Sequence, residues 1–187
     1  MKYDFDDPGY SREQKVVSVY KGATGSNVQI FDNNIQPVDS DSAASIEQCI
    51  CRYCTGIDPG NENAALQKNC RGIHADAIGK AGRSGRSHIY RCELGLMFWT
   101  GPIFREGKFS GALRGSGYVS DNANESEFAK KCNGTIPVNE FIRRIAALPT
   151  GDMEKINSLA EMLLLCTESV STGREKTLSS KGQHVLG

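Results

Sequence analysis

The chain has 187 residues, 39% hydrophobic and 24% charged, which fits one compact globular domain with terminal tails. Its 22 basic residues balance 22 acidic ones, and a formal net charge of zero argues against a domain covered by a nucleic-acid-binding surface. No stretch approaches the ~18 consecutive apolar residues that span a bilayer, and the N-terminus lacks the apolar segment of a secretory signal. We therefore expect a cytoplasmic protein with no membrane contact.

The first part of the chain predicts a tail, a helix and a hairpin. Residues 1–9 are acidic and contain a Pro-Gly pair, which is typical of a flexible tail. Ser11 can cap a helix that ends at the glycines of residues 22–25. Two short apolar runs, 28–31 and 35–38, flank an Asp-Asn-Asn turn and predict the two strands of a hairpin.

Two helices are expected next. Apolar residues recur at helical spacing over residues 46–53 and again over residues 62–78. The glycines of residues 79–85 should end the second helix.

The following third of the chain is rich in strand signals. Residues 88–92, 94–99 and 101–104 predict three short strands, and a turn at 105–108 leads to a longer strand at 109–119. The last strand contains several glycines, which indicates bulges or places where a ligand or another backbone comes close.

The C-terminal part is expected to be helical. Short helices are predicted at residues 125–132 and 137–145. A longer helix at 152–171 has apolar residues at intervals of three and four. The polar remainder, 172–187, reads as a linker. Helices together with an antiparallel sheet place the chain in the α+β class.

Seven cysteines without an export signal indicate reduced thiols in a cytosol. Cys51 and Cys54 form a C-x-x-C pair, and Cys70 and Cys92 could complete a four-thiolate site for zinc or an iron–sulfur cluster. The second C-x-x-C pair of most such sites is missing, and free cysteine is often simply buried. We favour the buried role and keep a metal or redox sensor as the alternative.

Catalytic motifs are not found. The sequence has no nucleophile elbow, phosphate-binding loop or zinc-protease motif. His88 and Cys92 lie four residues apart on one predicted strand, which is too far for a direct hydrogen bond at ~3.3 Å per residue. We expect no enzyme, and a cysteine-dependent enzyme would require a thiolate with a lowered pKa.

Two residues of the strand-rich third could contact a small ligand. Glu93 can accept hydrogen bonds from the hydroxyls of a polar ligand, or it can lie on the solvent side of its strand. Trp99 can form an apolar wall of a pocket, or it can belong to the core. Sequence alternation does not decide between these roles.

Several short motifs follow one another in a specific order and spacing. They are Ile50-Cys51, Cys70, Tyr90-Arg91-Cys92-Glu93-Leu94-Gly95-Leu96, Pro102-Ile103 and Gly111-Ala112-Leu113-Arg114-Gly115. Their order resembles the PocR sensory domain, found in AraC-type transcription activators, histidine kinases and related signalling proteins. The resemblance covers residues 10–170, with one departure: the histidine that follows the third cysteine in the family is Glu93 here.

The resemblance implies a PAS-like antiparallel sheet flanked by helices, which binds a small hydrocarbon derivative such as a short diol. Cys49 and Cys54 are additional to the family pattern, so a metal site is not implied by it. The residues expected to line the ligand site are Cys51, Cys70, Tyr90, Cys92, Glu93 and Trp99.

The resemblance also implies a division of the chain. A ligand-sensing domain at 10–150 would follow the tail, and the helix at 151–172 would transmit ligand occupancy. The spacing of three and four between its apolar residues could pair this helix with that of a second copy in a homodimer. Residues 173–187 would link to an output domain outside this chain, through which alone DNA would be bound.

Overall fold

The computed structural model describes much of the chain between residues 11 and 179. The described residues are 11–38, 64–92, 95–120, 139, 143 and 145–179, without the side chains at 64–69 and 172–179. Several predicted features therefore lie wholly or mostly outside the described residues: the tail at 1–9, the helices at 46–53, 125–132 and 137–145, and the end of the linker.

Five strands form one sheet in the order β1-β4-β3-β2, with β5 beside β4. The pairs along this order are antiparallel, and β5 runs parallel to β4. The sheet and the helices around it confirm the α+β class and the antiparallel sheet. The strands are β1 (Asn27–Asp32), β2 (His88–Arg91), β3 (Leu96–Arg105), β4 (Lys108–Ser120) and β5 (Thr150–Gly151).

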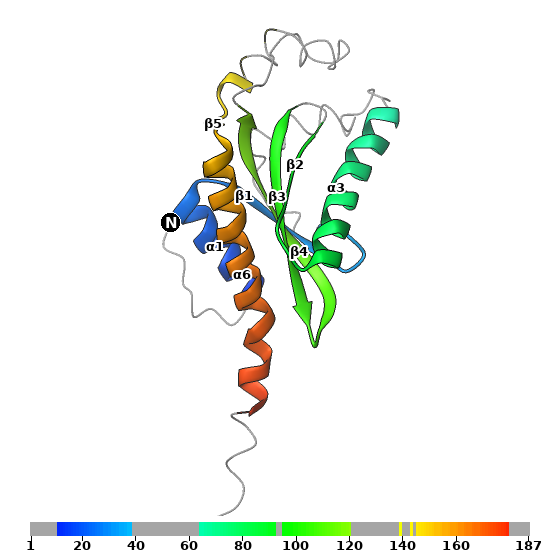
Figure 1. Ribbon diagram of the computed structural model, residues 1–187, viewed down its shortest axis with the longest axis vertical. Coiled ribbons are helices and arrows are strands. Elements are labelled where there is room, and N and C mark those ends of the chain that lie inside the picture. Colours follow the sequence, from blue (N-terminus) through cyan, green and yellow to red (C-terminus); the bar gives the residue numbers. More distant parts are fainter. Residues whose placement is uncertain are drawn as a thin grey trace, which may run out of the picture.

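Three described helices cover the two faces of the sheet. The helices α1 (Arg12–Thr24) and α6 (Met153–Ser179) lie together on one face, and α3 (Ala64–Ser84) lies on the other (Figure 1). None of the described helices has the length and the apolar composition that are needed to cross a bilayer. The sheet is therefore a layer between α3 and the α1–α6 pair.

The first helix begins and ends as predicted. The Ser11 side chain accepts from the backbone of Gln14, whose side chain accepts in return from the backbone of Ser11. Gly25 ends the helix in a left-handed conformation with φ of 70°. The caps satisfy backbone groups at both ends of α1, which packs on α6.

The helix α3 runs farther than the sequence predicted, because Gly82 lies at a packing contact and does not end the helix. A Cβ at Gly82 would lie 2.9 Å from the ring of Phe109, so the missing side chain lets the helix approach the sheet. The helix ends at Gly85, where φ is 67° and the backbone N–H donates to Ala81. The predicted end near residue 78 is therefore wrong.

Two strand predictions also change. The runs at 94–99 and 101–104 form the single strand β3, because Gly101 stays extended and lets α6 approach it. A Cβ at Gly101 would lie 3.1 Å from the side chain of Thr167. The run at 35–38 forms only a bridge between Pro37 and Phe31, and β1 pairs with β4 instead.

The C-terminal helix is confirmed, although it is longer than predicted. It begins at Met153, next to the expected residue, and continues to Ser179 through part of the segment that was read as a linker. Its buried face packs on β3 and β4. The main core cluster lies between this helix and the sheet and includes Tyr20, Ile30, Met97, Trp99, Leu113, Tyr118, Ile156 and Leu163.

Candidate functional site

The strand β3 sends neighbouring side chains to opposite faces of the sheet. Phe98 points toward α3, where its ring centroid lies 4.8 Å from that of His74. Trp99 points toward α1 and α6, and its Nε1 donates to the hydroxyl of Tyr20 at 3.0 Å. Side chains on the two faces of the sheet therefore have different neighbours. The predicted site residues are divided between these two faces.

The face that carries Trp99 is a close-packed core. The Tyr20 hydroxyl, which accepts from the indole, donates in turn to the backbone oxygen of Leu159 at 2.8 Å. Burial raises the pKa of Tyr20. A Cβ at Gly115 would overlap the indole, so β4 needs a glycine there. Trp99 thus joins the sheet to α1 and α6.

A row of polar side chains crosses the opposite face, which α3 covers. Gln29 of β1 pairs with Arg114 of β4, and Arg114 pairs with Thr100 of β3. Thr100 in turn pairs with His88 of β2. Cross-strand partners lie on the same face of a sheet, so these four residues form one row, here called the polar row.

Arg114 lies at the centre of the polar row between two aromatic rings. Its Cζ is 4.8 Å from the ring centroid of Phe31 and 5.3 Å from that of Phe98. Its Nη2 donates to Oε1 of Gln29 at 2.6 Å. Among the described residues, the buried Nε of Arg114 and the buried Oγ1 of Thr100 have no hydrogen-bond partner. Because buried polar atoms are nearly always paired, these two atoms indicate a place for a ligand.

A hydrogen-bonded pair adjoins the polar row. His74 of α3 and the hydroxyl of Tyr90 on β2 are 2.8 Å apart. Burial, and then the positive charge of Arg114, lowers the pKa of His74 to about 3. Burial raises the pKa of Tyr90. Both side chains are therefore uncharged at neutral pH, and the charge of this region belongs to Arg114.

The structure brings three predicted site residues together and separates a fourth. Cys92 is buried and Cys70 half-buried, and both thiols lie close enough to Tyr90 to add to the rise in its pKa. Trp99 lies on the other face of the sheet. Two further predicted residues, Cys51 and Glu93, lie outside the described residues.

The four-cysteine metal site remains a prediction. Its residues Cys51 and Cys54 are not among the described ones, which leaves only Cys70 and Cys92 to compare. Within the described part of the chain, no three His, Cys, Asp or Glu side chains are grouped so as to hold a metal ion.

Four residues of this region escaped the sequence reasoning: Gln29, His74, Thr100 and Arg114. Strand alternation carried a signal for one of them, since Gln29 separates the inward-facing Val28 and Ile30. Helix periodicity carried a signal for His74, because this residue follows Cys70 by one helical turn and lies on the same helix face. Alternation could not supply the pairing of the four strands that aligns the polar row.

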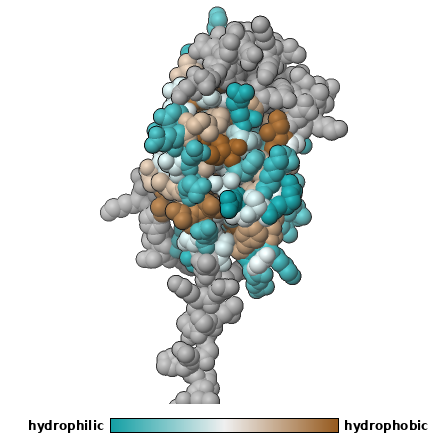
Figure 2. Space-filling model, viewed as in Figure 1, coloured by the Kyte–Doolittle hydropathy of each residue, from teal (hydrophilic) through white to brown (hydrophobic). Residues whose placement is uncertain are grey.

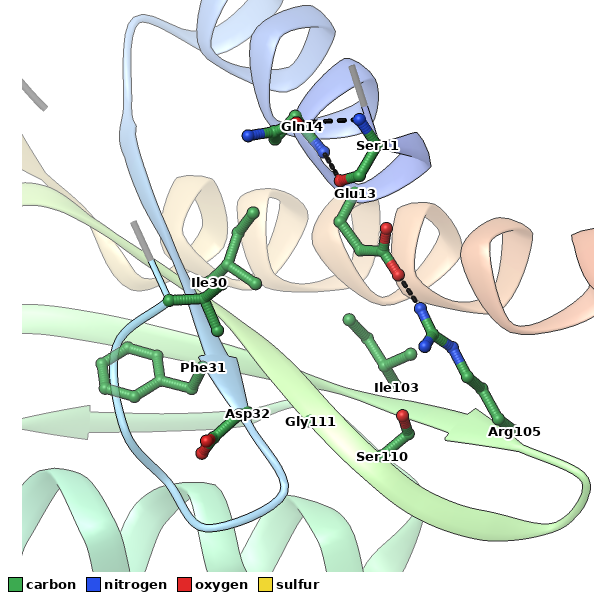
Figure 3. Close-up of a pocket in the computed structure, with 11 residues that line it drawn as sticks. Ser11, Glu13, Gln14, Ile30, Phe31, Asp32, Ile103, Arg105, Ser110 and Gly111 are labelled. Carbon is green, nitrogen blue, oxygen red and sulfur yellow. Dashed lines mark hydrogen bonds and ion pairs between the residues drawn. The ribbon is translucent and has the colours of Figure 1, made fainter. Parts of the chain in front are cut away.

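A cleft of about 460 Å³ lies elsewhere, where the first turn of α1 meets β1 and the β3–β4 hairpin (Figure 3). Its charged groups are paired within the protein, since Arg105 forms an ion pair with Glu13. The Asp32 carboxylate accepts from two backbone N–H groups of the turn that follows it. The polar row, with its unpartnered buried atoms, is the stronger candidate for a ligand site.

The chain has a family match among known proteins. A family model described as the sensory domain found in PocR matches residues 11–174. No curated protein and no solved structure gives a match. The matched segment begins at the N-cap of α1 and extends into α6, so it includes every strand of the sheet and the polar row. The chain therefore belongs to the PocR sensory domain family, whose members are sensing modules and not catalysts.

Proposed function

We propose that this domain binds a small hydrocarbon derivative, such as a short diol, between α3 and the sheet. The observation that carries the proposal is the pair of buried, unpartnered atoms in the polar row, Nε of Arg114 and Oγ1 of Thr100. Membership of a sensory family supports it. A hydroxyl of the ligand would complete the hydrogen bonding of both atoms.

The surroundings of the polar row suit a molecule with an apolar part. The rings of Phe31 and Phe98 flank Arg114 and offer apolar walls. Cys70, Tyr90 and Cys92 are proposed to line the same site. The predicted contributions of Cys51 and Glu93 belong to this proposal as well.

Occupancy would reach α6 through β3. The register of β3 shifts between Ile103 and Phe104, and the backbone N–H of Phe104 donates to Oγ of Ser171 on α6 at 3.0 Å. A few residues earlier, Gly101 packs against Thr167. Ligand contact at Thr100 therefore lies one residue from a contact with α6. The ligand can shift the helix only by its difference in affinity for two states.

The same helix is proposed to pair with a second copy of the chain. Met162 and Leu165 of α6 are 42% and 65% exposed. Hydrophobic residues appear among hydrophilic ones on the face that carries α6 (Figure 2). The domain would work in the cytoplasm as part of an AraC-type regulator or related signalling protein. DNA would be bound by an attached output domain.

Thermal denaturation with short diols, aldehydes and small acids tests the proposal. A ligand of the folded state should raise the melting temperature as its concentration increases. Thr100→Val should reduce that rise, because it removes the hydroxyl of the polar row and keeps the side-chain volume. Thr167→Val is the matched control, since Thr167 is equally buried on the opposite face. Failure of every compound to raise the melting temperature would contradict the proposal.

A further inference from the structure

The guanidinium of Arg114 lacks a counter-ion among the described residues. Ion pairs among these residues include those of Lys80 with Asp76 and of Arg105 with Glu13, and neither involves Arg114. The Nε of Arg114 is buried although the residue as a whole is half-buried, and a partly buried cation gains from an anionic partner. The side chain is held in this position by the sheet register and by two aromatic rings.

The neighbours of Arg114 do not neutralise its charge. Gln29 accepts one hydrogen bond through an uncharged amide oxygen. Tyr90 and His74 are uncharged at neutral pH, and Thr100 offers a hydroxyl. The described part of the site therefore presents a net positive charge beside a free hydroxyl and apolar rings.

We infer that the ligand is a small carboxylate, bound through an oxygen that accepts from Nε of Arg114. A carboxylate suits a guanidinium better than a hydroxyl does, because both partners of the hydrogen bond are charged. A hydroxyl on the adjacent carbon would pair with Thr100, and a short alkyl part would lie against Phe31 and Phe98. Short 2-hydroxy acids have this combination of groups. The inference rests on the proposed function and names the ligand class for the same site.

Lactate and 1,2-propanediol form a matched pair of probes, since they differ only in a carboxylate against a hydroxymethyl group. Titration calorimetry should give lactate an affinity about tenfold higher than that of the diol, the difference expected for one charge-assisted hydrogen bond. Arg114→Gln should remove that advantage, because it leaves both probes with the same uncharged neighbour. Arg91→Gln, which removes an exposed charge from β2, should leave both affinities unchanged.

Three results would overturn the inference. Equal affinity for both probes in the wild-type protein and in Arg114→Gln would exclude a role for charge while leaving the sensing function intact. Binding of neither probe, together with no response to the wider set of compounds, would remove the sensing function as well. Because Arg114→Gln can fail to fold, Arg114→Lys is measured in parallel. It keeps the charge without the Nε–H group, and a lactate affinity equal to that of the wild type would contradict the contact.

Discussion

Trp99 on the central strand donates its indole hydrogen to Tyr20 on α1 at 3.0 Å. The same tyrosine hydroxyl donates to the backbone of Leu159 on α6. One buried oxygen, the hydroxyl of Tyr20, therefore connects the sheet with both helices of the α1–α6 pair. In the proposed mechanism, a change in the position of β3 would reach α6 through this oxygen as well as through packing.

Tyr20→Phe should lower the free energy of unfolding by about 2 kcal/mol, because it leaves the buried indole N–H without an acceptor. Tyr118→Phe is the matched control. Tyr118 is also buried against Trp99, but it is not the acceptor of the indole N–H. The control should cost less than about 0.5 kcal/mol. Urea denaturation measures both, and equal losses would show that the hydrogen bond does not matter.

Gly82→Ala should destabilise the domain by about 1–3 kcal/mol, because the new methyl group would press on the ring of Phe109. Gly72→Ala provides the contrast within the same helix. Gly72 is exposed and has open space at its Cβ position, so alanine should stabilise α3 by up to about 1 kcal/mol. Chemical denaturation of the two variants should therefore show changes of opposite sign. A Gly82→Ala variant as stable as Gly72→Ala would mean that α3 does not dock as closely as described.

The domain should lose stability as the pH falls from about 6.5 toward 3 because of His74. Its pKa is about 3 in the folded state, against 6.5 for a solvent-exposed histidine, so in this window the unfolded chain binds a proton that the folded chain does not. The loss from this one group is at most about 1.4 kcal/mol per pH unit. His74→Asn should reduce the slope of unfolding free energy against pH. An unchanged slope in the variant would assign the acid sensitivity to other groups.

If α6 forms the proposed homodimer, Leu165→Glu should shift the protein to the monomer, because it places a charge in an apolar contact. Asn157→Glu adds the same charge at an exposed polar position of the helix and should leave the dimer intact. Sedimentation equilibrium over a range of concentrations distinguishes the two. A wild-type protein that stays monomeric throughout that range would contradict the dimer.

The sequence predicted those features that depend only on residues close together along the chain. Ser11 and Gly25 bound α1 as expected, and Glu106 and Gly107 form the expected turn, with φ of 53° and 72°. Gly82 was misread, because its role depends on the distant ring of Phe109 and not on local helix propensity. A glycine that breaks one helix can allow another to pack closely.

The candidate site also contains some residues that local sequence patterns identify and others that only the fold brings together. The motif around Tyr90 and Cys92 was found from the sequence, since it is a contiguous segment. Arg114 was not identified, because its hydrogen-bond partner Gln29 is 85 positions away along the chain. Only the pairing of β1 with β4 brings them together, and short-range patterns carry no information about strand pairing.

Side chains along β3 and β4 point alternately to the two faces of the sheet. The number of residues in these strands is therefore as important as their composition. Phe98 and Trp99, like Arg114 and Gly115, are adjacent in sequence and face opposite layers. Deleting or inserting a single residue in either strand would exchange its two faces. It would turn the guanidinium into the hydrocarbon interior and bring the indole out beside α3. Related chains should therefore vary in side chains along these strands and keep insertions to the loops.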